Sequence, residues 1–137
     1  MSRPPPSIDV AIALIQREGR YLVAQRGPGS HLAGAWEFPG GKREAGEAWE
    51  ACLRRELREE LGIEATVGEL VESFGFDYPE RAVQIRVFAC ELTGGEPEGQ
   101  DGQPVRWMTA EELARARYPA ANKPLIDRLL KMNHGLR

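Results

Sequence analysis

Cysteine and histidine are scarce in this sequence, which has two of each among its 137 residues. Cys52 and Cys90 are too far apart for a CxxC motif, and no Cys and His cluster has the spacing of a zinc site. We expect both cysteines to be free thiols in a reducing compartment, with a disulfide between them as the alternative.

Long apolar runs and an excess of positive charge are also absent. No stretch approaches the roughly 18 apolar residues of a membrane-spanning helix, and the beginning, MSRPPPSID, lacks the apolar core of a signal peptide. The formal net charge of −3 argues against a general binder of nucleic acid polymers. The sequence therefore predicts a cytoplasmic protein that binds neither membranes nor nucleic acid polymers. A small phosphorylated substrate is compatible with the acidity, because a metal and a few local cations can offset it.

The length suits a single domain with one sizeable core, and the hydrophobic (42%) and charged (28%) fractions are those of an ordinary globular protein. Residues 1–7, which include three consecutive prolines, are expected to form a flexible N-terminal lead-in, and residues 8–137 the domain.

Apolar periodicity and turn residues predict alternating strands and helices. Their order indicates a mixed sheet held between helices, in the α/β or α+β class. The expected elements are a hairpin of strands 8–16 and 20–26, a helix over 47–61, extended structure over 63–76 broken at two glycines, strands 82–92 and 105–108, a helix from 110 and a closing helix over 121–132.

The helix expected over residues 47–61 has an apolar stripe and an acidic stripe. Leu53, Leu57 and Leu61 recur at intervals of four, so they can face a core, and Gly62 suits the residue that ends the helix. Beside them, three glutamates at i, i+3 and i+4 project from nearly one patch. The acidic stripe consists of Glu56, Glu59 and Glu60.

Like charges four residues apart destabilise a helix by roughly 0.2–0.5 kcal/mol per pair, unless a cation lies between them. Carboxylate oxygens suit Mg²⁺, with Mn²⁺ as a possible substitute. The alternative is an ordinary solvated helix face. Before the helix, Gly40 and Gly41 predict a tight turn whose exposed backbone lets an ion or phosphate approach, and Lys42 follows directly.

The segment from Gly41 to Ile63 resembles the Nudix box, GX5EX7REUXEEXGU with U apolar. Gly41, Glu47 and the run RELREELGI from Arg55 to Ile63 occupy every fixed position. The resemblance implies a Nudix hydrolase with an α/β/α sandwich fold, a central mixed sheet, and the box as a loop–helix–loop on one side.

Resemblance to the MutT branch of this family extends over nearly the whole chain, through the runs WEFPGGK, YPER, GQDGQPVRWM and YPAANKP. That branch removes oxidised nucleotides such as 8-oxo-dGTP from the nucleotide pool, a function allied to DNA repair. It cleaves nucleoside triphosphates to the monophosphate and pyrophosphate, with water attacking the β-phosphorus. The metal ligands implied are the Gly40 carbonyl with Glu56, Glu59, Glu60 and Asp101.

Asp101 departs from the pattern, because the branch has a glutamate there, and Glu98 is an alternative ligand. Glu47 and Arg55 are implied to orient the carboxylates. The general base stays open among Glu56, Glu60 and Asp101.

Substrate contacts follow from the same resemblance. Arg26 and Lys42 are implied to bind phosphates, while the base pocket is formed by Phe38, Tyr78, Arg81 and Asn122.

An Asn amide offers a donor and an acceptor together, as the altered O6/N7–H edge of 8-oxoguanine requires. From the local sequence alone, Asn122 also suits a helix N-cap. His31, alone in a Gly-rich loop, is more typical of a surface residue than of a catalytic base.

Three other functions stay open: hydrolysis of CTP or modified cytosine nucleotides, hydrolysis of a diphosphate sugar such as ADP-ribose, and a binding module without catalysis. The sequence does not decide between monomer and homodimer, nor the number of metal ions.

Overall fold

The computed structural model describes residues 7–135, apart from the side chains of Tyr78 and of residues 133–135. Its strands are β1 (Ser7–Arg17), β2 (Arg20–Gln25), β3 (Trp36–Glu37), β4 (Gly40–Lys42), β5 (Glu64–Tyr78), β6 (Arg81–Gly94) and β7 (Val105–Met108). Its helices are α1 (Trp49–Leu61), α2 (Ala110–Arg115), the 3₁₀ turn η1 (Ala120–Asn122) and α3 (Lys123–Gly135). Residues 1–6 of the expected lead-in lie outside the described residues, and Ser7 begins β1.

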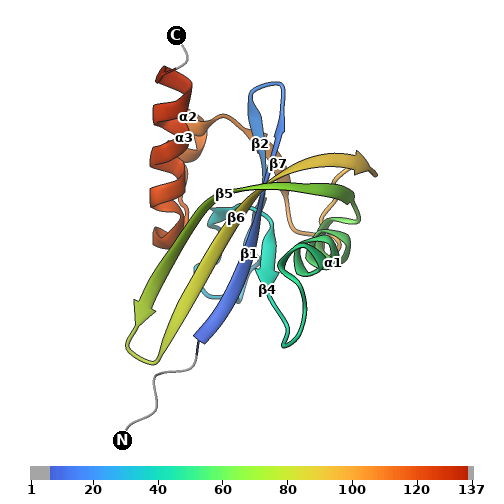
Figure 1. The fold of residues 1–137 in the computed structure, drawn as a ribbon. Coiled ribbons are helices and arrows are strands. Elements are labelled where there is room, and N and C mark those ends of the chain that lie inside the picture. The colour runs from blue at the N-terminus through green and yellow to red at the C-terminus, as the bar shows by residue number, and fades with distance from the viewer. Residues whose placement is uncertain (1–6, 136–137) are drawn as a thin grey trace, which may run out of the picture.

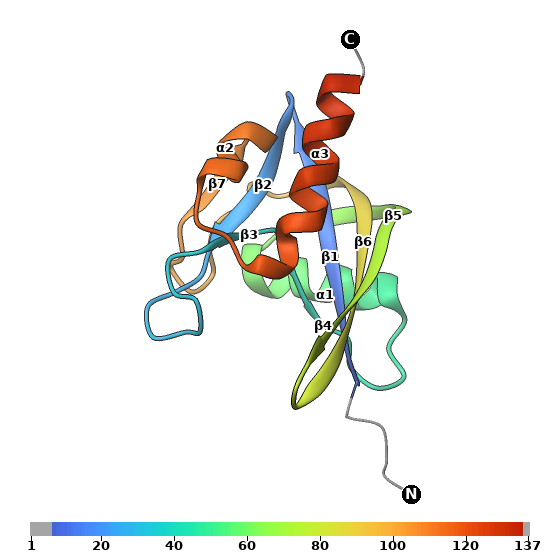
Figure 2. The same ribbon diagram turned by 90° about the vertical axis from the view of Figure 1, so that its left-hand side faces the viewer.

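The strands form one mixed sheet in the order β3-β2-β1-β6-β5, with β4 paired to β1 and β7 paired to β2. β1 and β6 run parallel, while the other pairs are antiparallel. Helix α1 covers one face of the sheet, and α2 and α3 lie on the other (Figures 1 and 2). The expected α/β/α sandwich with a central mixed sheet is therefore confirmed.

Successive side chains of β1 point to opposite faces of the sheet and belong to two separate hydrophobic clusters. Ile12 packs with the cluster that contains Leu125 and Leu129 of α3, whereas Ala11 and Ala13 pack with the leucines of α1. This is the period of two that a strand covered on both faces requires. The stripe of Leu53, Leu57 and Leu61 is fully buried, as its spacing predicts.

Helix α1 ends as predicted, at a glycine in the left-handed conformation. Gly62 has φ 66° and its N–H donates to the carbonyls of Arg58 and Leu57. The helix begins at Trp49, two residues later than expected, after Ala48, whose side chain makes no capping bond.

Two expectations about the strands are wrong. Gly40 and Gly41 do not form a tight turn but the short strand β4, in which Gly40 pairs with Ile12 and Gly41 with Ala11. The chain turns afterwards, in residues 43–48. The extended structure after α1 is not broken at Gly68 and Gly75 but forms one strand, β5, with register shifts that absorb the irregularity near Gly68.

The edge of β1 is shared between two partners. Residues 10–12 pair with β4, and residues 16 and 17 pair with β2. Between these two segments, the Ala13 N–H donates to the Pro39 carbonyl at 2.9 Å. The segment 36–42 therefore leaves β2 and joins β1, which places its residues at an opening between the strands.

Within residues 7–135, no helix has both the length and the apolar character needed to cross a membrane.

Candidate active site

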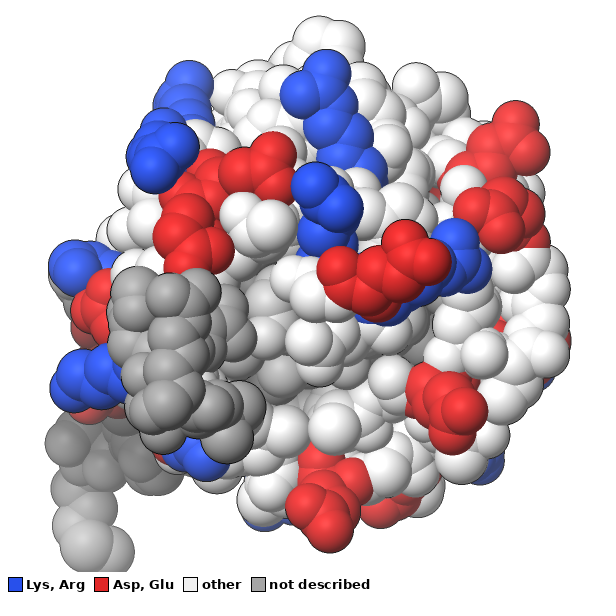
Figure 3. Space-filling model, turned by 90° about the horizontal axis from the view of Figure 1, so that it is seen from above, with Lys and Arg blue, Asp and Glu red and all other residues white. Residues whose placement is uncertain are grey.

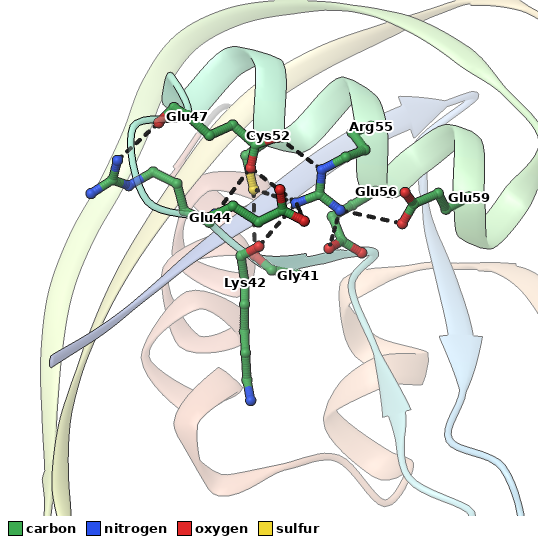
Figure 4. A network of polar contacts seen from close by, with 9 residues as sticks. Gly41, Lys42, Glu44, Glu47, Cys52, Arg55, Glu56 and Glu59 are labelled. Carbon is green, nitrogen blue, oxygen red and sulfur yellow. Dashed lines mark hydrogen bonds and ion pairs between the residues drawn. The ribbon is translucent and has the colours of Figure 1, made fainter. Parts of the chain in front are cut away.

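Arg55 is the centre of a polar network that joins α1 to the segment before it (Figure 4). Its Nε and Nη2 donate to the two carboxylate oxygens of Glu47 at 2.8 and 3.0 Å, and Nη2 also donates to the Lys42 carbonyl at 3.1 Å. Its Nη1 donates to Glu56 at 3.0 Å and to Glu59 at 3.2 Å.

A bidentate Arg–carboxylate pair fixes geometry more strictly than a point charge does. Hydrogen bonds from Arg55 hold the pKa of Glu47 at about 2, and the bonds to Glu47 and Glu56 raise the pKa of Arg55. The Arg55 guanidinium thus connects β4, the 43–48 turn and α1 through hydrogen bonds. The sequence predicted such a supporting role for Glu47 and Arg55.

The Glu56 carboxylate lies directly against the backbone of Gly41. A Cβ at residue 41 would overlap the Glu56 carboxyl group, and a Cβ at residue 40 would overlap the Ala11 carbonyl. Glycine at position 40 therefore allows the close approach of β4 to β1, whereas a side chain at position 41 would displace the Glu56 carboxyl group.

Glu60 is partly buried one helical turn after Glu56. Burial, followed by the charge and hydrogen bonding of Glu56 and the charge of Glu37, raises the pKa of Glu60 to about 8. A hydrogen bond from the Gly40 backbone acts in the opposite direction. Because the charge of Glu56 disfavours ionisation of Glu60, a cation would be favourable between the two groups.

Asp101 reaches the same region from the loop of residues 95–104. A cavity of about 530 Å³ is lined by Asp101, Glu60, Arg26 and Glu37 among others. Glu98, the alternative to Asp101, is not among the residues that line this cavity. The structure therefore places Asp101, and not Glu98, on the wall of the cavity that Glu60 also lines.

A second cavity, of about 370 Å³, adjoins the first and shares Arg26, Glu37 and Glu60 with it. It brings together six of the metal and substrate ligands predicted from the sequence. These are Arg26, Phe38, Gly40, Lys42, Glu60 and Asn122.

Apolar side chains from both strands and helices form much of the wall, including Ile12, Ile85 and Ala121. Phe38 is both a wall residue and a member of the core. His31 also lines this cavity, through its loop position.

Asn122 is the one polar side chain that is buried among the described residues, with 7% of its surface exposed. It belongs to η1, and its backbone N–H donates to the Pro119 carbonyl. In the described part of the chain, no hydrogen bond involves its side-chain amide, so no capping bond to α3 uses it. Its amide is therefore available to a ligand in the cavity.

Glu37 is a site residue that the sequence did not single out. Its carboxylate accepts two hydrogen bonds from Nη1 of Arg26, at 3.1 and 3.2 Å, and it lines both cavities. The sequence feature that could have identified Glu37 is its place in the WEFPGGK run, next to Phe38 and close to Gly40 and Lys42.

The two remaining predicted contacts of the base are Arg81 and Tyr78. Arg81 is exposed at the start of β6 and lines neither cavity. The side chain of Tyr78 lies outside the described residues. Both assignments stay predictions.

The carboxyl oxygens of Glu56 and Glu60 suit a hard divalent cation, because both groups lie beside the backbone of Gly40 and Gly41 and the charge of Glu56 disfavours ionisation of Glu60. The described residues do not hold three or more acidic, Cys or His side chains around a single point. Glu59, 59% exposed, is engaged by Arg55. A full ligand set would therefore require Glu59 to leave Arg55, or Asp101 to approach.

Residues 5–129 match the model of the NUDIX domain, so the chain belongs to the Nudix family. It is 41% identical over 129 residues to the 8-oxo-dGTP diphosphatase of Haemophilus influenzae, covering 93% of this chain and 95% of that one. It is 38% identical over 125 residues to the CTP pyrophosphohydrolase of Escherichia coli, covering 91% and 93%. The crystal structure of a MutT protein from Methanosarcina mazei superposes with a TM-score of 0.82 at 28% identity, covering 96% and 99%.

The fold, the box and these relatives define a Nudix hydrolase of the MutT-like kind. Hydrolases of this family generally act with a divalent metal ion. The predicted family, fold class and enzyme class are thus confirmed.

Proposed function

We propose that this protein hydrolyses 8-oxo-dGTP to 8-oxo-dGMP and pyrophosphate with Mg²⁺. The observation that carries the proposal is the largely buried Asn122 side chain, whose amide makes no hydrogen bond among the described residues and which lines the cavity that Glu60 and Gly40 also line. A base and a polyphosphate fit this arrangement with the base at Asn122 and the phosphates at the acidic helix.

The chemistry of the base favours the oxidised purine. Guanine has two acceptors, O6 and N7, side by side, whereas 8-oxoguanine has the acceptor O6 beside a donor, N7–H. The Asn122 amide can donate to O6 and accept from N7–H of the oxidised base. With guanine, its oxygen would face the N7 lone pair and lose that bond.

The phosphates are placed at the acidic helix by cations and by the metal. Lys42 and Arg26 line the cavity near Glu60 and would contact phosphate oxygens, with Glu37 holding the Arg26 guanidinium in place. Glu56, Glu60 and the Gly40 carbonyl would hold Mg²⁺, with Glu59 and Asp101 as further ligands. The ion would supply positive charge to the phosphate oxygens and make the attacking water more acidic.

In the reaction, water adds to the β-phosphorus and the bond from that phosphorus to the oxygen of the nucleoside monophosphate breaks. One of Glu56, Glu60 and Asp101 takes the proton of the water. Arg55 and Glu47 keep Glu56 oriented and do not contact the substrate.

The test is a comparison of initial rates with Mg²⁺ on 8-oxo-dGTP, dGTP, CTP, 5-methyl-dCTP and ADP-ribose, with products identified. We expect the highest kcat/KM on 8-oxo-dGTP, with monophosphate and pyrophosphate as products. A preference for any other nucleotide would overturn the substrate assignment. Release of inorganic phosphate in place of pyrophosphate would show that a different phosphoanhydride bond is cleaved.

A second candidate is hydrolysis of CTP or a modified cytosine nucleotide, favoured by the 38% identity to a CTP pyrophosphohydrolase. Cytosine also presents a donor, N4–H, beside an acceptor, N3, to which an amide can bond. The CTP and 5-methyl-dCTP rates in the same panel separate the candidates.

We infer that the protein acts in the cytoplasm, where the nucleotide pool is found. Support comes from Cys52 and Cys90, which are both free thiols.

A further inference from the structure

The loop of residues 95–104 is attached to the C-terminal end of α1. The backbone N–H of Glu98 donates to the Leu61 carbonyl at 3.1 Å, and that of Gln100 donates to the Glu60 carbonyl at 2.9 Å. Carbonyls in the last turn of a helix have no partner within the helix. The loop supplies these partners, so its backbone is fixed to the residue that presents the Glu60 carboxylate.

Gln103 adds a side-chain bridge within this attachment. Its Nε2 donates to the Glu60 carbonyl at 3.3 Å, and its Oε1 accepts from the Asp101 backbone N–H at 2.9 Å. One amide therefore contacts the backbones of both residues whose carboxyl groups line the larger cavity. Sequence reasoning gave Gln103 no role, although it lies in the GQDGQP run.

The turn around Asp101 is shaped to admit this amide. The Gly102 N–H donates to the Gly99 carbonyl at 3.0 Å, which makes Asp101 the third residue of a closed turn. A Cβ at residue 99 would overlap the carbonyl and the amide of Gln103. Glycine at this position lets the Gln103 side chain fold back onto the turn.

We propose that Gln103 is a positioning residue that holds Asp101 beside Glu60, so that the Asp101 carboxylate can serve the metal site. This rests on the proposed function for the role of Asp101. An aspartate has a single methylene, so the place of its carboxylate depends closely on the position of its backbone. The Gln103 bridge sets that position relative to the end of α1.

The test measures Mn²⁺ affinity by electron paramagnetic resonance in the full chain without nucleotide. The variants are Gln103→Met, Asp101→Asn and the double variant, with Gln100→Met as the matched control. Met keeps the length of the side chain and removes both hydrogen bonds. The Gln100 side chain donates to the Glu98 carbonyl at 3.0 Å and, among the described residues, makes no hydrogen bond to Asp101 or Glu60, so its variant should bind as the wild type does.

Gln103→Met and Asp101→Asn are each expected to weaken Mn²⁺ binding about tenfold, the lower end of what residues supporting a metal site contribute. The double variant should bind no more weakly than Asp101→Asn, because Gln103 acts through Asp101. Wild-type affinity in either single variant would overturn the proposal. So would a further loss in the double variant, or an equal loss in Gln100→Met.

If Gln103→Met does not fold, hydrogen exchange of the wild-type protein tests the proposal instead. The Asp101 amide proton, which Gln103 accepts, should exchange with solvent more slowly than an unprotected amide, and unprotected exchange would overturn the bridge. Neither readout uses hydrolysis. Absence of nucleotide turnover by the wild type would therefore overturn the proposed function alone.

Discussion

At the scale of single residues, Asn122 is the side chain that we propose to discriminate between bases. Asn122→Ala should lower kcat/KM for 8-oxo-dGTP by roughly tenfold or more, since a lost hydrogen bond that leaves a buried partner unpaired costs about 1–3 kcal/mol. The effect on dGTP should be smaller, because guanine makes fewer bonds to the amide. Steady-state rates on both substrates check this.

The control for Asn122 is Gln84→Ala, which removes an amide that donates to Ser73 at 2.9 Å, outside both cavities. It should leave the ratio of the two kcat/KM values unchanged. An unaltered ratio in Asn122→Ala as well would remove Asn122 from base recognition.

Glu60 makes the stability of the metal-free protein depend on pH. Its pKa is about 8 in the folded protein and has an ordinary value of 4.5, so folding favours the protonated carboxyl group. This contribution to stability is fully present below about pH 4.5 and is lost as the pH rises through 8. We expect the urea midpoint of the wild type in chelator to fall over this range relative to that of Glu60→Gln.

Glu50→Gln is the matched control for Glu60, because Glu50 is an exposed glutamate in the first turn of the same helix. Its pH profile should parallel that of the wild type. If the Glu60→Gln profile did so too, the carboxyl group would not be buried beside Glu56 as described.

At the scale of elements, the attachment of α1 to β4 depends on the shape of a guanidinium. Arg55→Lys keeps the charge but cannot bond Glu47 through two nitrogens while also reaching Glu56 and the Lys42 carbonyl. We expect kcat with Mg²⁺ to fall about tenfold or more, as loss of support for a metal site typically does. Arg54→Lys, an exposed arginine on the same helix, should have wild-type kcat.

An Arg55→Lys enzyme with full activity would show that charge alone suffices at this position. Thermal unfolding of both variants distinguishes a lost fold from a misplaced carboxylate.

The elements also show what sequence can predict. The buried face of α1, its end at Gly62 and the two long hairpins follow from local spacing and turn residues. Strand β4 does not, because three residues with two glycines carry no strand pattern and their pairing depends on β1, far away in the sequence. The position of Arg81 outside the cavities could not be predicted either, because it depends on the direction in which the β5–β6 hairpin extends from the sheet.

The site was predicted best where the Nudix box fixes spacing on one helix. Glu37 was missed because its importance comes from Arg26 across the β2–β3 pair, and Gln103 because its bonds join a loop to the far end of α1. Such contacts between elements are set by packing, which a single sequence does not display.

At the scale of the whole molecule, Cys52 reports whether the α1 layer opens. Its thiol is fully buried in the core beneath α1, and burial, with a smaller effect of Glu47, raises its pKa to about 11. In a Cys90→Ser background, Cys52 should therefore react with iodoacetamide at pH 8 only as fast as the protein unfolds. Mass spectrometry of alkylation with and without urea checks this, and fast labelling in native buffer would mean that α1 detaches.

Charge on the surface agrees with a small-molecule substrate. On the face seen from above, the basic side chains of the described residues are interspersed with acidic ones and form no continuous basic surface (Figure 3).

The shared edge of β1 has one more consequence. The opening between β2 and β4 connects the two faces of the sheet. Asn122, from the α3 layer, and Glu60, from the α1 layer, therefore line the same cavity. Under the proposed function, recognition of the base and hydrolysis of the phosphate would thereby fall to separate stretches of the chain on opposite faces of the sheet. Substitutions around residues 119–122 would then change the choice of base while the residues of the acidic helix stay in place.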